Sequence, residues 1–263
     1  MPSVSNIAVG ALVAGSAASK ARHGMNESIA RLSTGLRSIY GGDAAGQSVA
    51  NTLQARSKSW AVAARNAEDG ISAAQTAESA LLEIAALAQR MRELGIQADN
   101  AALLSTTNDI AAMNAEAKAV STAIDAIVSK TTFNGVAMLD TSAVTKNIGV
   151  TDDGATVALK TTDGISAATF QTAAGADGTA DTVLKEVAIS LGHVAAGISA
   201  LKGRQAVAYS ASANLAAAAS RIEDTDFAKE TANLAKMSVL NQSAMAMVAQ
   251  ANQAQSAILA VLQ

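Results

Sequence analysis

The two ends of the chain carry no charged side chain. Residues 1–19 and residues 237–263 contain no Asp, Glu, Lys or Arg, although the chain as a whole holds 22 acidic and 19 basic residues. Long uncharged helices cannot stand alone in water, and the Ser, Asn and Gln content of both ends is too high for a lipid bilayer. Both ends are therefore expected to be buried against other protein surfaces.

Composition favours long, closely packed helices over a conventional compact core. Hydrophobic residues make up 50% of the 263 residues, but aromatic residues make up only 2%, and Pro2 is the one proline. Much of the hydrophobic share is alanine, which is the best helix former and a poor source of buried area. The sequence therefore predicts a mainly α-helical protein, built as a long antiparallel coiled-coil or helical-bundle rod.

Charge and cysteine content narrow the classes of partner. The net charge is −3 and the basic residues are scattered, so we expect no nucleic-acid binding. Zero cysteines exclude disulfides, thiolate catalysis and cysteine metal sites.

The apolar stretch at residues 4–18 follows no Lys or Arg and is interrupted by Ser, Asn and Gly. We interpret this stretch as a helix of the mature protein. We expect that it is not cleaved off as a signal peptide and does not insert stably into a membrane.

Apolar residues recur at alternating spacings of three and four over most of the chain, as in helices with a heptad seam. Polar turn-forming residues separate the two central tracks at residues 99–107, so the chain is expected to fold back there. The third track supplies a partner for the first two, which places the N-terminal and C-terminal helices side by side. The apolar tracks cover residues 9–36, 77–98, 110–127, 184–222 and 237–261.

The middle of the chain is rich in Thr, Gly, Asp and Ser. Two β-prone runs, residues 147–150 and residues 156–160, flank the sequence Asp153-Gly154, which is a hairpin signal. We predict a small β-hairpin that lies outside the helical core. The expected division is into paired terminal helices at residues 1–40 and 223–263, a helical rod at residues 41–140 and 181–222, and a short β-rich tip at residues 141–180.

The residues offer no catalytic constellation. His23 and His193 are the two histidines, and neither lies in the His-Glu-x-x-His pattern that binds zinc in metalloproteases. The sequence also has no P-loop and no nucleophile elbow. The adjacent carboxylates Glu68 and Asp69 are better explained as a polar helix face. We therefore expect no enzyme activity, no metal and no cofactor.

A series of motifs resembles bacterial flagellin. The matches occur in the right order from residue 32 to residue 253, which makes the resemblance highly specific. They are LSTGLR at residues 32–37, RNAEDGIS at 65–72, AQTAE at 74–78, RMREL at 90–94, TFNG at 132–135, SRIEDTDF at 220–227 and VAQANQ at 248–253.

The connector after the first of these motifs departs from the family pattern. Residues 38–46 read SIYGGDAAG, which is one residue shorter than the usual flagellin connector and lacks its lysine. Gly35 and the pair Gly41-Gly42 are expected to mark the bend between the terminal helix and the rod.

The resemblance implies a subunit of the flagellar filament, in a minimal form without large outer domains. Such a subunit polymerises into a helical homopolymer for swimming motility, leaves the cell by type III export and forms an extracellular filament. The resemblance also implies an export chaperone, a filament cap and hook-junction proteins as partners. An isolated terminal helix buries too little surface to offset backbone ordering at roughly 1–2 kcal/mol per residue, so we expect the ends to fold on assembly.

Two sets of residues are expected to mediate that assembly. The first packs the filament core. The second lies on the rod. The family resemblance implies that these residues form contacts between subunits and, in animal hosts, are recognised by an innate immune receptor. The alternative explanation is that they form only a solvated helix face. The receptor hypothesis fails if micromolar monomer does not activate the receptor. The core set is Leu12, Leu32, Leu36, Leu240, Met247, Ile258 and Val261, and the rod set is Gln89, Arg90, Arg92, Glu93, Leu94 and Glu116.

Two other functions fit part of the pattern. The hook–filament junction protein shares the terminal architecture of flagellin but forms only a short connecting layer, and the motifs of the central rod favour flagellin over it. A cytosolic coiled-coil adaptor would be expected to have charged, soluble ends. Flagellin should be abundant outside the cell and form long polymers, whereas a junction protein should be scarce and an adaptor should stay inside.

Overall fold

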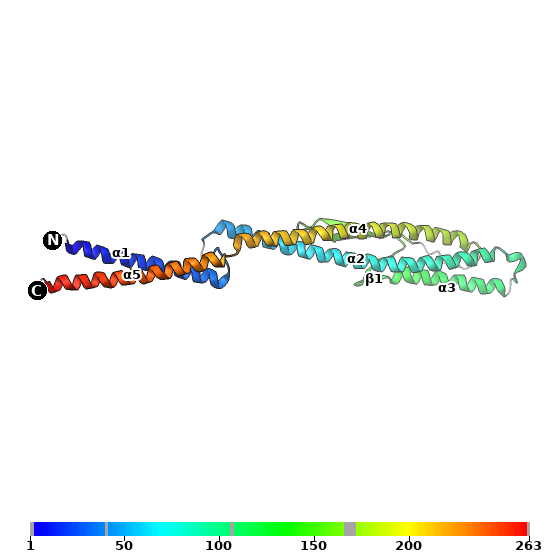
Figure 1. Cartoon of the computed structure of the whole chain (residues 1–263). Coiled ribbons are helices and arrows are strands. Elements are labelled where there is room, and N and C mark those ends of the chain that lie inside the picture. The colour runs from blue at the N-terminus through cyan, green and yellow to red at the C-terminus, as the bar shows by residue number, and fades with distance from the viewer. Residues whose placement is uncertain (1–2, 40–41, 106–107, 166–171, 262–263) are drawn as a thin grey trace. The chain divides into compact units, whose positions relative to one another are not determined.

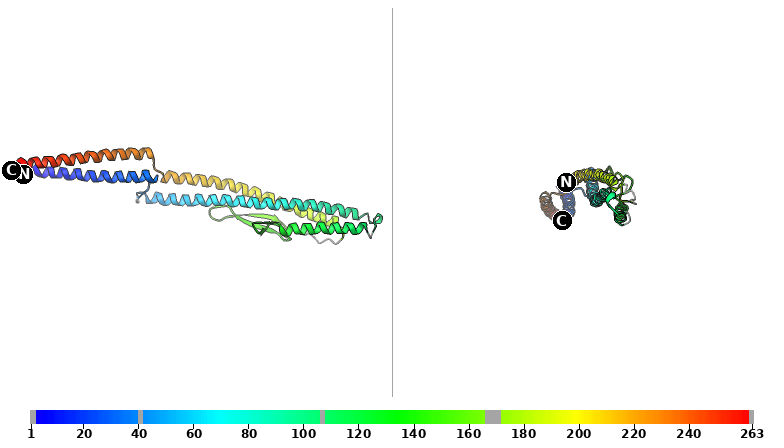
Figure 2. Two further views of the ribbon diagram at one scale, coloured as in Figure 1. Left: turned by 90° about the horizontal axis from the view of Figure 1, so that it is seen from below. Right: turned by 90° about the vertical axis from the view of Figure 1, so that its right-hand side faces the viewer.

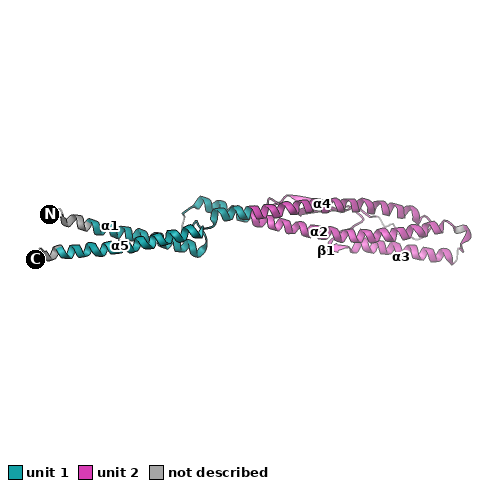
Figure 3. Cartoon of the chain, viewed as in Figure 1, with its two compact units in different colours: residues 1–55, 215–263 teal, residues 56–214 magenta. Residues whose placement is uncertain are grey.

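The computed structural model describes the backbone of residues 3–39, 42–105, 108–165 and 172–261, and side chains between Val9 and Ala257. It divides into two compact units, coloured separately in Figure 3: unit 1 holds Met1–Ala55 and Leu215–Gln263, and unit 2 holds Arg56–Asn214. The mainly helical prediction is confirmed. The helices are α1 (Ser3–Thr34), α2 (Ala44–Ala98), the short 3-10 helix η1 (Ala101–Leu103), α3 (Asp109–Lys130), α4 (Ala176–Glu223) and α5 (Phe227–Val261).

Unit 1 is organised around the two terminal helices. Helices α1 and α5 pack side by side and run antiparallel, so that the two chain ends lie together (Figures 1 and 2). This confirms the predicted pairing of the N-terminal and C-terminal helices. Residues 44–55 of α2 and residues 215–223 of α4 complete the unit.

Backbone hydrogen bonds tie the segment after α1 to the segment between α4 and α5. Helix α1 ends before Gly35, whose φ of +73° is the left-handed conformation that suits glycine after a helix. Leu36 forms an isolated antiparallel bridge with Asp224, and the Thr225 N–H donates to the Gly35 carbonyl at 2.8 Å. The bend predicted at Gly35 is confirmed, while Gly41 lies outside the described residues.

Unit 2 is a helical bundle formed by α2, α3 and α4. Its core consists of apolar side chains that recur every three or four residues on each helix, which is why these segments are helical and pack on one face. The turn expected at residues 99–107 is found between α2 and α3. The largest fully buried helical side chains of the core are Leu81, Ile84, Met91, Ile124, Val183 and Val187.

Two small hairpins lie against this bundle. Strands β1 (Thr132–Phe133) and β2 (Val136–Ala137) pair through a tight turn with positive φ at Asn134 and Gly135. Strands β3 (Val144–Gly149) and β4 (Thr156–Thr162) pair antiparallel, with Ile148 opposite Val157. The hairpin predicted around Gly154 is confirmed, and the φ of this glycine is +86°.

The hairpin β3–β4 does not lie outside the helical core, which corrects the expectation of a separate tip. Figure 2 shows its strands running beside α2, and Leu159 on β4 is 0% exposed within the same apolar cluster as the helices. Arg56 on α2 also pairs with Asp152 in the β3–β4 turn at 2.7 Å. The contact was not predicted because the segment is rich in Thr, Gly, Asp and Ser, and only a few of its residues, such as Leu159 and Asp152, attach it to the helices. The three-part division of the chain stays a prediction.

Helix α4 is long and apolar enough to cross a membrane by length and composition alone. Its buried residues Val183, Val187 and Val194 belong to the core cluster of unit 2. The same features are therefore accounted for by a helix of a protein core, and the absence of membrane insertion stays a prediction.

Close packing of α2 against α4 gives a test of the core of unit 2. A Cβ atom added at Gly95 would lie 2.3 Å from the backbone nitrogen of Asp177, so backbone would have to move. We expect Gly95→Ala to lower the free energy of unfolding by about 1–3 kcal/mol, despite the better helix propensity of alanine. Urea unfolding of the monomer followed by circular dichroism measures this change.

Gly192 on α4 provides the matched control. A Cβ atom there would meet nothing within 4 Å. Gly192→Ala is expected to raise the free energy of unfolding by roughly 0.5–1 kcal/mol, because only helix propensity changes. Equal effects of the two substitutions would contradict the close α2–α4 contact.

Candidate assembly surface

The seam between α1 and α5 is built from small side chains. Ala18, Ala21 and Ser28 of α1 and Ala244 of α5 are buried there. Gly24 leaves room for the side chain of Met237, which lies 3.2 Å from the position of an added Cβ atom. Small side chains let two helices approach closely, but they bury little apolar area at about 25 cal/mol per Å². The pair is therefore weakly held by its own seam.

Of two buried polar groups in this seam, one is unpaired and one is hydrogen-bonded. The Oδ1 atom of Asn241 is buried with no hydrogen-bond partner within the described part of the chain. Glu230 is also buried, where Arg31 donates to it at 3.4 Å. An unpaired buried amide oxygen costs about 1–3 kcal/mol, so the seam contributes less than an all-apolar one would.

Larger apolar side chains lie outside the seam, on the exposed surface of both helices. Leu12 on α1 is 76% exposed, and Leu240 and Met247 on α5 are 47% and 63% exposed. The surrounding sequence holds no charge before Lys20 or after Lys236. An extended uncharged surface with several large apolar side chains marks an interaction site in a water-soluble protein. We name the large apolar side chains that are exposed in these two uncharged segments the terminal face: Val9, Leu12, Val13, Val239, Leu240, Met245 and Met247.

The predicted core set divides between the seam and the terminal face. Leu32 and Leu36 are half-buried, whereas Leu12, Leu240 and Met247 belong to the terminal face. The side chains of Ile258 and Val261 lie outside the described residues. On α5 the residues turned toward α1 are Met237, Asn241, Ala244, Val248 and Ala251.

The choice of α5 residues that face α1 explains the exposure of Leu240 and Met247. The apolar track read from the sequence shares Met237, Ala244 and Ala251 with the observed seam, but the positions between them are taken by Asn241 and Val248. Leu240 and Met247 are thereby left free to contact other molecules. Their role in packing a filament core stays a prediction.

The rod set forms a network of ion pairs on the surface of unit 2. The Arg90 guanidinium bonds to Glu116 at 2.7 Å and to Glu93 at 2.9 Å, and Arg92 bonds to Asp181 at 2.8 Å. The hydrogen bonds that Arg90 donates to Glu116 and, with a smaller effect, to Glu93 raise the pKa of Arg90. Gln89 is exposed beside them. The network joins all three helices of the bundle and presents charge to solvent.

Leu94 differs from the rest of the rod set. It is 1% exposed and packs with Ala98, Met113, Ala117 and Ala173 in a small cluster. Its side chain therefore supports the surface from beneath and is not available to another molecule in the free chain. A heptad position inside a charged motif is the signal that would have identified it as a core residue.

Sequence reasoning missed a clamp on Glu223. This buried carboxylate accepts hydrogen bonds from the side-chain amides of Gln47, at 3.2 Å, and Gln54, while its backbone carbonyl accepts from the Arg37 N–H at 2.7 Å. The clamp ties α2 to the end of α4 within unit 1. Only its position inside the matched motif at residues 220–227 hinted at a special role.

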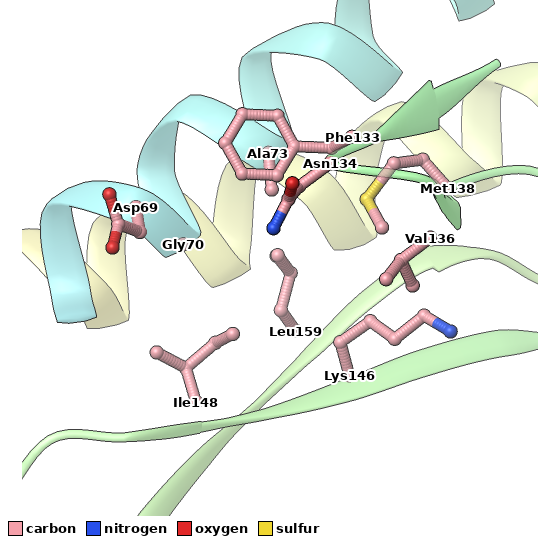
Figure 4. Close-up of a pocket in the computed structure, with 10 residues that line it drawn as sticks. All are labelled: Asp69, Gly70, Ala73, Phe133, Asn134, Val136, Met138, Lys146, Ile148 and Leu159. Carbon is pink, nitrogen blue, oxygen red and sulfur yellow. The ribbon is translucent and has the colours of Figure 1, made fainter.

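A groove opens on unit 2 between α2 and the two hairpins (Figure 4). Its volume is about 510 Å³, and it is mostly apolar, with Asp69 from α2 and Lys146 from β3 among its few polar residues. In Figure 4, Ile148 and Leu159 rise from the strands towards α2. Among the described residues, no group of three or more His, Cys, Asp or Glu side chains could hold a metal ion.

Acidic pH provides a test of the α1–α5 seam. A hydrogen bond from Ser28, with smaller contributions from Asn233 and Arg31, lowers the pKa of Glu230 against the opposing effect of desolvation. A carboxylate with a lowered pKa in the folded state stabilises that state above its unfolded pKa, and this contribution is lost as pH falls through the folded pKa. We expect filaments of Glu230→Gln to change less in stability between about pH 5 and pH 3 than wild-type filaments.

The pH at which preformed filaments release monomer measures this difference by sedimentation. Glu27→Gln is the control, because Glu27 is exposed and pairs with the same Arg31 at 3.6 Å. Its profile should match wild type. Identical profiles for Glu230→Gln and wild type would show that the carboxylate does not stabilise the pair.

Comparisons with known proteins agree with the motifs. Residues 6–144 match the family model for the bacterial flagellin N-terminal helical region, and residues 178–262 match the model for the C-terminal helical region. A flagellin of Halalkalibacterium halodurans is 36% identical over 88% of this chain and 89% of its own length. A flagellin of Bacillus subtilis is 34% identical over 88% of this chain and 90% of its own length.

Some relatives are much longer than this chain. The flagellin of Escherichia coli K12 is 40% identical over 55% of this chain but only 29% of its own length. The two family models and the relatives matched over most of their length establish that this chain belongs to the bacterial flagellin family.

Proposed function

We propose that this chain, a structural filament subunit and not an enzyme, polymerises into the helical filament of the bacterial flagellum and that its terminal helices complete their folding during assembly. The observation that carries the proposal is the terminal face. Several large apolar side chains of α1 and α5 stay exposed, while most of the fully buried side chains in the seam between the helices are alanines.

This arrangement favours assembly over a stable free monomer. Ordering the backbone costs roughly 1–2 kcal/mol per residue, and a seam of small side chains offsets only part of that cost. Covering Leu12, Leu240 and Met247 with neighbouring copies adds the missing apolar burial. Because the same surfaces meet in every copy without closing a ring, the assembly continues as a helical filament.

The charged surface of the rod set supplies a second candidate contact. Arg90, Glu93 and Glu116 are held in place by their ion pairs and face solvent in the free chain. We assign Gln89, Arg92 and these three residues to contacts between subunits. Recognition of the same surface by an innate immune receptor is the further hypothesis, which receptor activation by purified monomer tests directly.

Export, location and remaining partners follow from the same proposal. A filament outside the cell requires secretion, for which we propose type III export with a dedicated chaperone, a filament cap and hook-junction proteins as partners. A hook–filament junction protein is the alternative function. It is not favoured, because relatives named flagellin match both terminal regions and most of the length of this chain.

Seeded polymerisation tests the proposal. Purified monomer is mixed with sheared filament fragments, the product is imaged by electron microscopy, and helicity is followed by circular dichroism. We expect long tubes and a rise in helicity as the terminal helices order. Absence of tubes, with helicity already complete in the monomer, would point to the junction protein or to a self-contained coiled coil.

A further inference from the structure

Burial separates the seven methionines that the structure describes, all except Met1, into three classes. Three lie in the core of unit 2, two are half-buried in the α1–α5 seam, and two are exposed on α5. The core residues are Met91, Met113 and Met138, the seam residues are Met25 and Met237, and the exposed residues are Met245, at 47% exposure, and Met247, at 63%.

We propose that Met247, together with its neighbour Met245, is a reversible oxidation site that controls addition of the subunit to a filament. The inference rests on the proposed assembly function. Met247 lies outside the seam, so it is exposed whether or not α1 and α5 are paired, and in the proposed filament another copy of the chain covers it. Its oxidation state is therefore set before assembly and protected afterwards.

The chemistry needs only a hydroperoxide. The sulfur lone pair of Met247 attacks the terminal oxygen of hydrogen peroxide, a sulfur–oxygen bond forms, the oxygen–oxygen bond breaks, and water leaves after proton transfer. The thioether loses two electrons and peroxide gains them. A sulfoxide reductase that draws on two thiols reverses the change, releasing water and a disulfide.

Met247 is expected to react faster than Met245 in the paired helices. It is the more exposed of the two, and the Arg22 guanidinium lies 3.6 Å from the sulfur of Met245 as a hydrogen-bond donor. Donation to that sulfur engages the lone pair that peroxide requires. The exposed position of Met247 makes it the main site.

Oxidation changes the character of the terminal face. A thioether is apolar and flexible, whereas a sulfoxide is polar and carries a strong hydrogen-bond acceptor. No charged residue follows Lys236, and the Arg22 guanidinium lies at the sulfur of Met245. Moving a polar sulfoxide from water into an apolar contact between subunits costs free energy, so elongation should slow.

Peptide mass mapping tests the selectivity. Purified monomer is treated with hydrogen peroxide and digested, and the sulfoxide fraction is measured at each methionine. We expect oxidation at Met247 and Met245, with Met91, Met113 and Met138 at least tenfold slower. In assembled filaments, oxidation of Met247 should fall to the level of the core residues. Equal oxidation of all methionines in the monomer, or unchanged oxidation of Met247 in filaments, would overturn the proposal.

Seeded elongation tests the control of assembly. Oxidised wild-type monomer should elongate at least tenfold more slowly than untreated monomer, and treatment with methionine sulfoxide reductases should restore the rate. A variant with Met245→Leu and Met247→Leu keeps apolar side chains of similar size and should elongate at a normal rate after peroxide. Met25→Leu is the matched control and should remain sensitive.

These outcomes separate the inference from the proposed function. Untreated monomer that fails to elongate on seeds would contradict the assembly function, while the mapping experiment would still report on the oxidation site. Untreated monomer that elongates normally, with no slowing after oxidation of Met247, would overturn the inference alone. Continued sensitivity of the double leucine variant would also overturn it, because the effect would then come from other residues.

Discussion

Leu240→Asp is expected to abolish elongation of the filament while leaving unit 2 folded. The Leu240 side chain is 47% exposed in the free chain and lies in a segment without charges. In the proposed filament this position is covered by another subunit, where an unpaired carboxylate costs about 3–5 kcal/mol. A cost of that size raises the critical concentration of monomer by roughly 100-fold or more. Sedimentation of seeded reactions measures the critical concentration.

Leu240→Met is the matched control for this substitution. It replaces the branched leucine with an unbranched apolar side chain of similar volume, so polymer yield should be close to wild type. Both variants should show the wild-type unfolding midpoint for unit 2, because Leu240 belongs to unit 1. Wild-type polymer yield from Leu240→Asp would contradict burial of the terminal face.

Leu159→Ala is expected to cause a large loss of stability in unit 2. The side chain is 0% exposed on β4 and packs with residues of the helical core. Truncation removes buried methyl groups and leaves a cavity, which costs about 2–5 kcal/mol. The free energy of unfolding from urea titration of the monomer measures this loss. A large effect would show that the hairpin β3–β4 is an integral part of the core.

Leu103→Ala makes the same chemical change at an exposed position. Leu103 lies at the end of η1 and is 80% exposed. Its truncation should alter the free energy of unfolding by no more than about 0.5 kcal/mol, as for most surface substitutions. If Leu159→Ala were equally mild, the hairpin would be a separable appendage, as the sequence alone suggested.

Helix positions were predictable because each apolar track has a clear period. The track at residues 110–127 lies within α3, and the track at residues 77–98 ends with α2 at Ala98. The hairpin was also predictable, since Asp153-Gly154 carries the turn. In these cases the structure is decided by residues that are close together in the sequence, so a single sequence is sufficient to predict it.

Details of packing were not predictable for a different reason. On α5, alanine is so frequent that more than one apolar stripe fits a helical period, and the pair with α1 uses Asn241 and Val248 in place of Leu240 and Met247. Similarly, Leu94 stands inside a charged motif but is buried, and Leu159 stands inside a polar segment but completes the core. Each choice depends on contacts between segments distant in sequence.

The candidate assembly surface was partly visible from the sequence. Uncharged ends indicated burial against other protein, and the structure adds that the larger side chains point away from the intramolecular seam. The clamp on Glu223 had no recognisable pattern, because its two glutamines come from a different helix. The selective exposure of two methionines likewise appears only once the register of α5 is known.

Hydrogen exchange compared between monomer and filament tests the central claim most directly. Amides of α1 and α5 should exchange rapidly in the monomer and slowly in the filament, because neighbouring copies supply the burial that the small-residue seam lacks. Amides around Ile84, Ile124 and Val187 in the core of unit 2 should be protected in both states. Protection of α1 and α5 that is already complete in the monomer and unchanged in the filament would contradict folding coupled to assembly.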